Sequence, residues 1–324
     1  MKSIRKMLGF VLLLSVTFVN AQSRILSENG FENCIELSNK SVRVVLTPSL
    51  GGRVLKYELN GLNILYVDSA QNGLTEKPKG MYKGPSAGRF DFGPTRVIPK
   101  HDNLWWGMWT SEITGNYAAR LISQIDKATG VQLIRDFELD PESSKLKITQ
   151  TILNKSNETK RYCFWGRTFV KGGGATFVPL NASSRFPKKY LAYGDQKEIF
   201  FDPEDEANLK VEKNVFVLNK ESAYKKYVMD GEEGWMAYLS TDNQLFVKKF
   251  EVFPDKVYAE MTACTMSVWF SEDQIVEIEP MGPWEWIEAG ESSSFVEEWY
   301  LVDFESKQTT DAILEKVEQM IQKD

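Results

Sequence analysis

Apolar and polar residues alternate along most of the chain, from about residue 33 to residue 304. Within residues 131–139, for example, Val131, Leu133 and Phe137 share one face of an extended segment. This alternation is typical of β-strands that bury one face. The pattern predicts strands at Ser41–Thr47, Val131–Leu139, Lys145–Asn154, Tyr162–Val170, Trp235–Leu239, Gln244–Phe253, Val257–Thr262, Ser267–Phe270, Gln274–Glu279 and Ser294–Asp303.

One helical pattern stands at the end of the chain. Apolar residues at positions 313, 314, 317, 320 and 321 have the spacing of one helix face. They predict a helix over about residues 309–323 that packs on the outside of a sheet. Many strands without alternating helices predict an all-β fold, a large antiparallel sandwich or a barrel. We expect a single domain over residues 22–324.

The first 21 residues have the pattern of a secretory signal peptide. Lys2, Arg5 and Lys6 precede an apolar run over residues 8–19, and small residues stand at the expected cleavage site after Ala21. The run is too short to span a bilayer, and no cysteine follows the cleavage site. We expect an exported protein, periplasmic or secreted, with no membrane span and no lipid anchor. The oligomeric state stays open.

Composition narrows the classes of function. A hydrophobic content of 42% and a charged content of 26% are ordinary for a folded protein. The formal net charge of −6 argues against nucleic acid as a partner, although a local basic pocket is compatible with it. Cys34, Cys163 and Cys264 show no CxxC spacing, so no redox motif or thiolate zinc site is indicated. We expect no metal and no cofactor, and either one disulfide or three buried thiols.

Residues 70–110 are expected to form a long irregular loop that carries unusual side chains. Arg89 and Asp91 are followed by three closely spaced tryptophans, Trp105, Trp106 and Trp109. An indole presents a flat apolar surface to a sugar ring, and Arg and Asp hydrogen-bond its hydroxyl groups. These residue types predict a sugar-binding site on the loop. The alternative is that the tryptophans only pack the loop onto the sheet.

His101 is the one histidine of the chain. Any mechanism or zinc site that needs two histidines is therefore excluded. A lone histidine is more often structural than catalytic, but Arg89 and Asp91 lie close to it in sequence. A structural role and a role in the predicted site therefore both stay open.

Two predicted strands carry charged residues on one face. Trp165 and Arg167 share a face, which predicts a cleft or an arginine paired with a buried carboxylate. Glu277 and Glu279 share another, and enclosing two carboxylates would raise the pKa of one of them and suit acid–base chemistry. The alternative is a solvent-facing acidic stripe on an edge strand. The lysines at positions 248 and 249 are expected to be solvated.

Both ends of the mature chain resemble the galactose-mutarotase-like superfamily. The segments Pro48-Ser-Leu-Gly-Gly-Arg53 and Asn60-Gly-Leu-Asn-Ile-Leu-Tyr66 are similar to the opening part of its members, and residues 279–301 are similar to their closing part. The resemblance covers most of the chain and looks closest to an uncharacterised bacterial branch. It implies one large antiparallel β-supersandwich that binds a carbohydrate on its concave sheet face.

The resemblance also implies roles for individual residues. Mutarotases open the sugar ring with a glutamate base and a histidine acid. Glu279 best matches the base, with Glu277 as the fallback. Arg89 looks like the arginine that holds the sugar, and His101 is similar to a second, helping histidine. The family residues after that arginine are replaced here, beginning with Asp91.

The acid histidine of the family has no counterpart in this chain. The corresponding stretch, residues 157–164, contains no histidine. Arg161, Tyr162 or Arg167 would have to take its place. This departure leaves mutarotation itself open.

These inferences give one candidate site and three hypotheses for its use. The predicted catalytic residues are Glu279, His101 and Tyr162, and the predicted sugar-binding residues are Arg89, Asp91, Trp105, Trp106, Trp109, Trp165, Arg167 and Glu277. The first hypothesis is acid–base chemistry at a sugar carbon, either mutarotation or epimerisation, or elimination or dehydration of a uronate. The second is a non-catalytic carbohydrate-binding protein of a polysaccharide-utilisation system. The third is a scaffold with a relic pocket.

Overall fold

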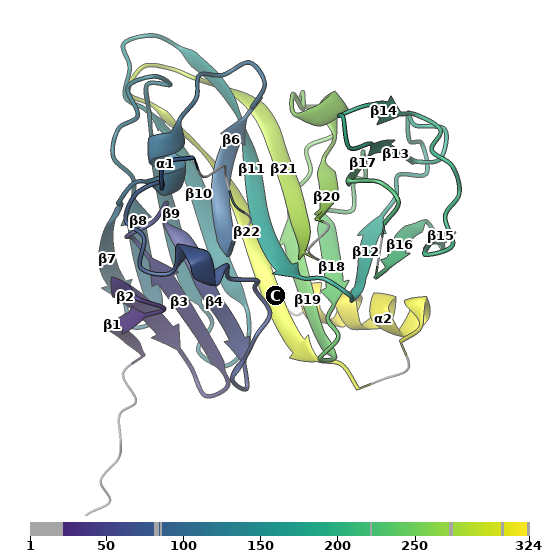
Figure 1. The fold of residues 1–324 in the computed structure, drawn as a ribbon, viewed down its shortest axis with the longest axis horizontal. Helices are drawn as coiled ribbons and strands as arrows, with labels where there is room; N and C mark the ends of the chain where they lie inside the picture. Colours follow the sequence, from purple (N-terminus) through teal and green to yellow (C-terminus); the bar gives the residue numbers. More distant parts are fainter. Residues whose placement is uncertain are drawn as a thin grey trace, which may run out of the picture.

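A computed structural model describes residues 22–80, 84, 86–220, 222–271, 275–305 and 308–322. The predicted signal peptide, residues 1–21, lies outside the described residues. Two antiparallel β-sheets, one of 12 strands and one of 10, stack face to face (Figure 1). The expectation of an all-β antiparallel sandwich is confirmed.

The strand order shows which segments become neighbours. The larger sheet runs β1 (Ser23–Glu28), β2 (Phe31–Ser38), β3 (Val42–Thr47), β4 (Arg53–Leu59), β6 (Gly88–Gly93), β11 (Lys160–Lys171), β21 (Ile275–Ile287), β20 (Met266–Phe270), β17 (Lys226–Met229), β13 (Tyr190–Tyr193) and β14 (Ile199–Phe200), with β5 (Leu62–Asn63) beside β4. The smaller sheet runs β15 (Leu209–Glu212), β16 (Val215–Asn219), β12 (Ala175–Pro179), β18 (Trp235–Leu239), β19 (Gln244–Phe250), β22 (Ser292–Asp303), β10 (Leu146–Asn154), β9 (Val131–Leu139), β8 (Ala118–Ile122) and β7 (Thr110–Gly115). The centre of the larger sheet therefore joins segments from residues 88 to 287.

The main hydrophobic core fills the space between the two sheets. Alternation along the central strands sends Phe90, Phe164 and Ile278 into this space, where each is at most 3% exposed. Burying a side chain of this size contributes about 1.5–3 kcal/mol. The same alternation sends the residues between them, among them Arg89 and Glu277, to the outer face of the larger sheet.

The C-terminal helix covers the outer face of the smaller sheet. Helix α2 (Thr310–Ile321) begins after Thr309, whose hydroxyl accepts a hydrogen bond from the Ala312 backbone N–H. Its residues Ile313 and Val317 pack against apolar side chains of that sheet. The predicted helix and its packing are confirmed. Among the described residues, no helix combines the length and the apolar character needed to cross a membrane.

Two expectations about irregular and extended segments are wrong. Residues 70–110 are not one loop, because they include the 3-10 helix η1 (Ser69–Gln71) at their start, the central strand β6 and helix α1 (Asp102–Trp106). Residues 257–262 are not a strand but lead into the 3-10 helix η2 (Met261–Ala263). All three residues of η2 have positive φ, from 37° to 60°, which breaks the extended conformation.

The Gly-Gly turn that follows β3 holds helix α1 against the larger sheet. Gly51 and Gly52 have φ of 65° and 56°, which favours glycine. A Cβ atom on Gly51 would lie 2.1 Å from the Trp105 carbonyl oxygen, and one on Gly52 would lie 2.5 Å from the Trp109 ring. The turn thus lets α1 and the Trp109 ring pack at close range.

Lys248 corrects another expectation, because its side chain is 0% exposed rather than solvated. Its Nζ lies 2.8 Å from Glu297 Oε2 and donates to Thr168 Oγ1 at 3.0 Å.

The three cysteines are buried and free, so no disulfide forms.

Candidate functional site

Five neighbouring strands bring charged side chains together on the outer face of the larger sheet. Arg89 of β6 lies opposite Arg167 of β11, and Ser267 of β20 lies opposite Glu279 of β21. Lys226 comes from β17, the next strand along. We call Asp91, His101, Arg167, Glu277, Glu279 and Lys226 the polar cluster.

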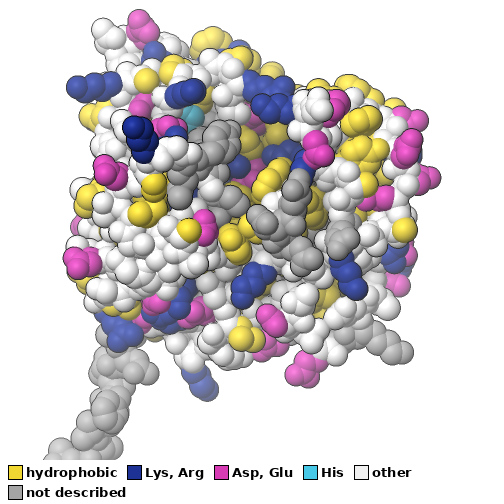
Figure 2. All heavy atoms as spheres, in the orientation of Figure 1, with side chains coloured by type: hydrophobic (Ala, Val, Ile, Leu, Met, Phe, Trp, Pro, Cys, Tyr) yellow, Lys and Arg dark blue, Asp and Glu magenta, His cyan; other side chains and the backbone are white. Residues whose placement is uncertain are grey.

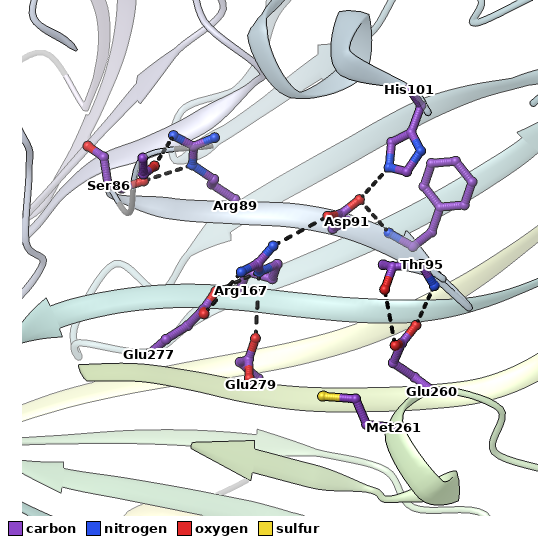
Figure 3. A network of polar contacts seen from close by, with 12 residues as sticks. Ser86, Arg89, Asp91, Thr95, His101, Arg167, Glu260, Met261, Glu277 and Glu279 are labelled. Atoms are coloured by element: carbon purple, nitrogen blue, oxygen red, sulfur yellow. Dashed lines mark hydrogen bonds and ion pairs between the residues drawn. The ribbon is translucent and has the colours of Figure 1, made fainter. Parts of the chain in front are cut away.

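Arg167 is the centre of the polar cluster (Figure 3). Its Nε donates to Glu277 Oε1 at 2.6 Å, and its Nη2 donates to Glu277 Oε2 at 3.1 Å. The same guanidinium lies 3.6 Å from Asp91 Oδ2 and 3.6 Å from Glu279 Oε1. Burial by itself lowers the pKa of Arg167, but the three carboxylates, Glu277 first, raise it above its ordinary value. Arg167 therefore stays charged and holds carboxylates on two sides.

The two glutamates are held differently. Glu279 Oε2 accepts a hydrogen bond from Lys226 Nζ at 2.5 Å and another from the Ser267 hydroxyl. Glu279 Oε1 has no hydrogen-bond partner among the described residues. Burial raises the pKa of Glu277 to about 7 against the charge of Arg167, and repulsion from Glu279 adds to the rise. Both side chains are at most 1% exposed, so the expectation of a solvent-facing acidic stripe is wrong.

His101 and Asp91 form a pair that carries a proton. His101 Nδ1 lies 3.0 Å from the Pro99 carbonyl oxygen, which can only accept, so a hydrogen bond at this nitrogen requires a proton on Nδ1. His101 Nε2 lies 2.8 Å from Asp91 Oδ1, which also accepts from the Phe92 backbone N–H at 3.0 Å. A hydrogen bond between Nε2 and Oδ1 therefore needs one further proton, on the imidazole or on the carboxyl group. Either way, the pair holds a proton beside Arg167.

Tryptophans and cations alternate across the outer face. The Trp105 ring centroid lies 4.1 Å from the Arg89 guanidinium carbon and 4.8 Å from that of Arg167. The Trp165 ring lies 4.5 Å from Arg167 and 5.0 Å from Lys226 Nζ. At such distances the ring faces stabilise the cations. Trp105 and Trp165 are 3% and 6% exposed, so they position cations rather than offer open faces to a sugar.

Arg89 and Arg53 extend this series of cations away from Arg167. Both share the Gln71 side-chain oxygen, which accepts from Arg53 Nη1 at 2.7 Å and from Arg89 Nη2 at 3.2 Å. Burial, with repulsion from Arg53 and Arg167, lowers the pKa of Arg89 well below its ordinary value. Arg89 Nη1 has no hydrogen-bond partner among the described residues.

Three predicted site residues lie away from the polar cluster. Tyr162 points into the core between the sheets, where its hydroxyl donates to the Thr129 carbonyl at 2.7 Å. Trp109 belongs to the same core and donates from Nε1 to the Leu104 carbonyl. Trp106 packs behind Arg89, in an apolar group with Trp105. Within the part of the chain that the structure describes, these three side chains bond or pack with the core and with Arg89 rather than with the polar cluster.

Two members of the site were not expected from the sequence. Lys226 lies on a strand of four residues, and Ser267 is one small hydroxyl in an apolar strand. Glu260 is a fourth buried carboxylate nearby, and it accepts hydrogen bonds from the Thr95 backbone N–H and hydroxyl at 2.7 and 3.2 Å. Within the described ranges, no group of three or more His, Cys, Asp or Glu side chains is arranged to hold a metal ion.

The polar cluster reaches solvent at one side. The side chains of Arg167 and Lys226 are 16% and 12% exposed, which makes them its most accessible members. Lys226 and Trp165 also line a pocket of about 380 Å³. Figure 2 shows basic and acidic side chains close together in the upper middle of this face.

Solved structures share this architecture at low sequence identity. A putative aldose 1-epimerase from Escherichia coli K12 aligns with a TM-score of 0.61 and 11% identity, over 83% of this chain and 98% of that one. A galactose mutarotase-like protein from Lactobacillus casei aligns at 0.59 and 10%, over 83% and 100%. Another from Clostridium acetobutylicum aligns at 0.54 and 13%, over 87% and 98%. No protein-family model and no curated protein matches the chain. The chain therefore has the galactose-mutarotase-like fold, as its sequence resemblance implies.

Proposed function

We propose that this protein binds a carbohydrate on the outer face of its larger sheet and performs acid–base chemistry at a sugar carbon. One observation carries the proposal. A carboxylate oxygen without a hydrogen-bond partner, Glu279 Oε1, and a proton-bearing pair, Asp91 and His101, both flank the guanidinium of Arg167. A proton acceptor and a proton donor on two sides of one cation are the parts that such chemistry needs.

Mutarotation uses these parts as follows. Glu279 Oε1 takes the proton of the anomeric hydroxyl while the bond between the anomeric carbon and the ring oxygen breaks. The electrons of the O–H bond form the carbonyl of the open chain, and the ring oxygen receives the proton held by Asp91 and His101. Rotation about the next carbon–carbon bond and the reverse transfers give the other anomer. Arg167 stabilises negative charge that develops on oxygen.

Lys226 and Ser267 have a distinct role in this scheme. Both donate to Glu279 Oε2, so they leave Oε1 as the oxygen that can accept a proton. Glu277 gives both its oxygens to Arg167 and acts as a positioning residue. The pair of Asp91 and His101 takes the place of the acid histidine that residues 157–164 lack.

A non-catalytic carbohydrate-binding protein is the second candidate. The specific observation in its favour is the burial of the acid–base groups, because Asp91, Glu277 and Glu279 are at most 1% exposed. Such a network of ion pairs could also serve only to shape a binding face.

The Glu279→Gln variant separates the two candidates. We expect it to keep sugar binding within a few-fold of the wild type and to lose at least 100-fold in turnover, since the amide cannot accept the proton. Proton NMR in D2O with neutral sugars and uronates measures anomer exchange, deuterium incorporation and new alkene signals together. Glu288→Gln, at an exposed glutamate directly after the end of β21, is the matched control. Equal turnover of Glu279→Gln and wild type would remove Glu279 as the base, and binding without any turnover in the wild type would establish the second candidate.

A further inference from the structure

A pocket of about 380 Å³ lies directly beside the polar cluster on the outer face. Side chains from four strands line it: Trp165 of β11, Trp269 of β20, Lys226 of β17 and Tyr193 of β13. Its volume falls in the range of small-molecule sites. Because Lys226 bonds Glu279 and Trp165 packs on Arg167, a ligand in this pocket adjoins the proposed chemistry.

The pocket has more positive than negative side chains. Its cations are Arg96, Lys197, Lys225 and Lys226, and its carboxylates are Asp195 and Glu260. The whole chain has a formal net charge of −6, so this local excess of positive charge is opposite in sign to the protein as a whole. A concave, partly apolar site with such an excess concentrates anions.

The two carboxylates of the pocket do not neutralise all four cations. Asp195 lies 3.5 Å from Lys225 Nζ. Glu260 is 4% exposed, accepts hydrogen bonds from Thr95, and has a pKa that burial raises. Lys226 is already paired with Glu279, outside the pocket lining.

Arg96 and Lys197 are the cations left over. Both are exposed, and neither side chain makes a hydrogen bond or ion pair with another residue in the part of the chain that the structure describes. They come from the segment after β6 and from the turn between β13 and β14, on different elements. Two such cations beside an aromatic lining match a ring that carries an anionic group: the ring packs on Trp269, which is half-buried, and the anion pairs with the cations.

We propose that this pocket selects an acidic sugar, one that carries a carboxylate or a sulfate group, for the site at Glu279. The inference rests on the proposed function and deepens it by naming the substrate class. Arg96 and Lys197 are its specificity-determining residues. The fold supplies the aromatic lining, and these two side chains supply the discrimination against neutral sugars.

Titration calorimetry with three probes tests the proposal: galactose, galacturonate and galactose 6-sulfate. We expect the wild type to bind at least one of the two acidic probes at least tenfold more tightly than galactose, with affinity that falls as salt rises. The two acidic probes distinguish a carboxylate from a sulfate as the recognised group. The double variant Arg96→Gln/Lys197→Gln should lose the preference, with at least tenfold weaker binding of the preferred acidic probe. Lys40→Gln/Lys127→Gln, at exposed lysines outside the pocket lining, is the matched control and should keep the preference.

Two results would overturn the proposal: equal affinity of the wild type for neutral and acidic probes, or a preference that survives in the double variant. NMR measurement of anomer exchange with the same three probes distinguishes failure of the pocket proposal from failure of the proposed function. Exchange without an acidic preference refutes the pocket and leaves the chemistry. An acidic preference without exchange supports the pocket and refutes the chemistry at Glu279.

Discussion

Glu277 shows how one residue combines a buried charge with a proton equilibrium near neutrality. Its carboxylate is paired with Arg167 on both oxygens, yet its pKa is raised to about 7 because burial outweighs this pairing. A carboxyl group whose folded pKa lies above the ordinary value of 4.5 binds its proton more tightly in the folded state. The folded protein therefore loses stability through this group as the pH rises from 4.5 to about 7.

Replacing Glu277 by Gln removes this titration. Relative to wild type, the free energy of unfolding of Glu277→Gln should rise between pH 4.5 and pH 7, by up to about 3 kcal/mol. Urea unfolding of both proteins at pH 5.0 and pH 7.5 measures the difference. Glu158→Gln, whose parent side chain is 74% exposed, is the control and should change stability by less than about 0.5 kcal/mol. A difference between Glu277→Gln and wild type that stays constant with pH would contradict the assigned cause.

Helix α1 carries Trp105 and Trp106, two of the three tryptophans that the sequence indicates. Trp105 packs on arginines rather than presenting an open face to a sugar. The five residues of the helix place Trp105 between Arg89 of β6 and Arg167 of β11. The helix lies against the Gly51-Gly52 turn, where no larger residue fits. Helix, turn and strands thus form one unit that fixes the direction of the Arg167 guanidinium.

The Trp105→Leu variant tests this unit. It should lower the free energy of unfolding by about 2–4 kcal/mol, because a large buried ring is lost, and weaken sugar binding by more than about 1 kcal/mol, because Arg167 loses a packing surface. Thermal unfolding and calorimetry measure the two effects. Trp286→Leu is the control, since Trp286 also stacks on an arginine, Arg161, but is 65% exposed. Sugar affinity as high in Trp105→Leu as in Trp286→Leu would contradict the positioning role.

At the scale of the molecule, a buried ionic network joins the two sheets behind the site. Lys248 of β19 contacts Glu297 of β22 within the smaller sheet. Its Nζ also donates to Thr168 Oγ1 at 3.0 Å and to the Ile278 carbonyl at 3.4 Å, across in the larger sheet. Thr168 and Ile278 are sequence neighbours of Arg167, Glu277 and Glu279. The network therefore supports the strands that carry the polar cluster.

Removing one charge of this network should be costly. Lys248→Met leaves Glu297 buried without its cation and should lower the free energy of unfolding by about 3–5 kcal/mol. The double variant Lys248→Met/Glu297→Gln should recover part of this loss, because the side chain left without Lys248 is then neutral. Urea unfolding of the wild type, both single variants and the double variant gives the coupling energy. Strict additivity of the two substitutions would show that the pair does not act as a unit.

The sequence by itself determined the properties that depend on local alternation. A period of two fixes which neighbours along a strand share a face, so the antiparallel all-β class, the shared face of Trp165 and Arg167 and that of Glu277 and Glu279 could all be predicted. The helix at residues 310–321 followed from its own local period. The turn at Gly51 and Gly52 was equally visible, because positive φ has a residue signature. The short strand β6 was missed, although Phe90 and Phe92 alternate with charged residues, because glycines and a proline bound it.

Only the tertiary structure decided which of these faces meet. Lys226 reaches Glu279 across 53 positions of sequence, and Arg167 reaches Glu277 across 110. Strand order follows from how two whole sheets bury their apolar faces against each other, and no local period encodes it. For the same reason the sequence could not show that Lys248 is buried or that Tyr162 points into the core. The sequence indicated the residue types of the site, whereas their arrangement around Arg167 comes from the packing of strands that are distant in sequence.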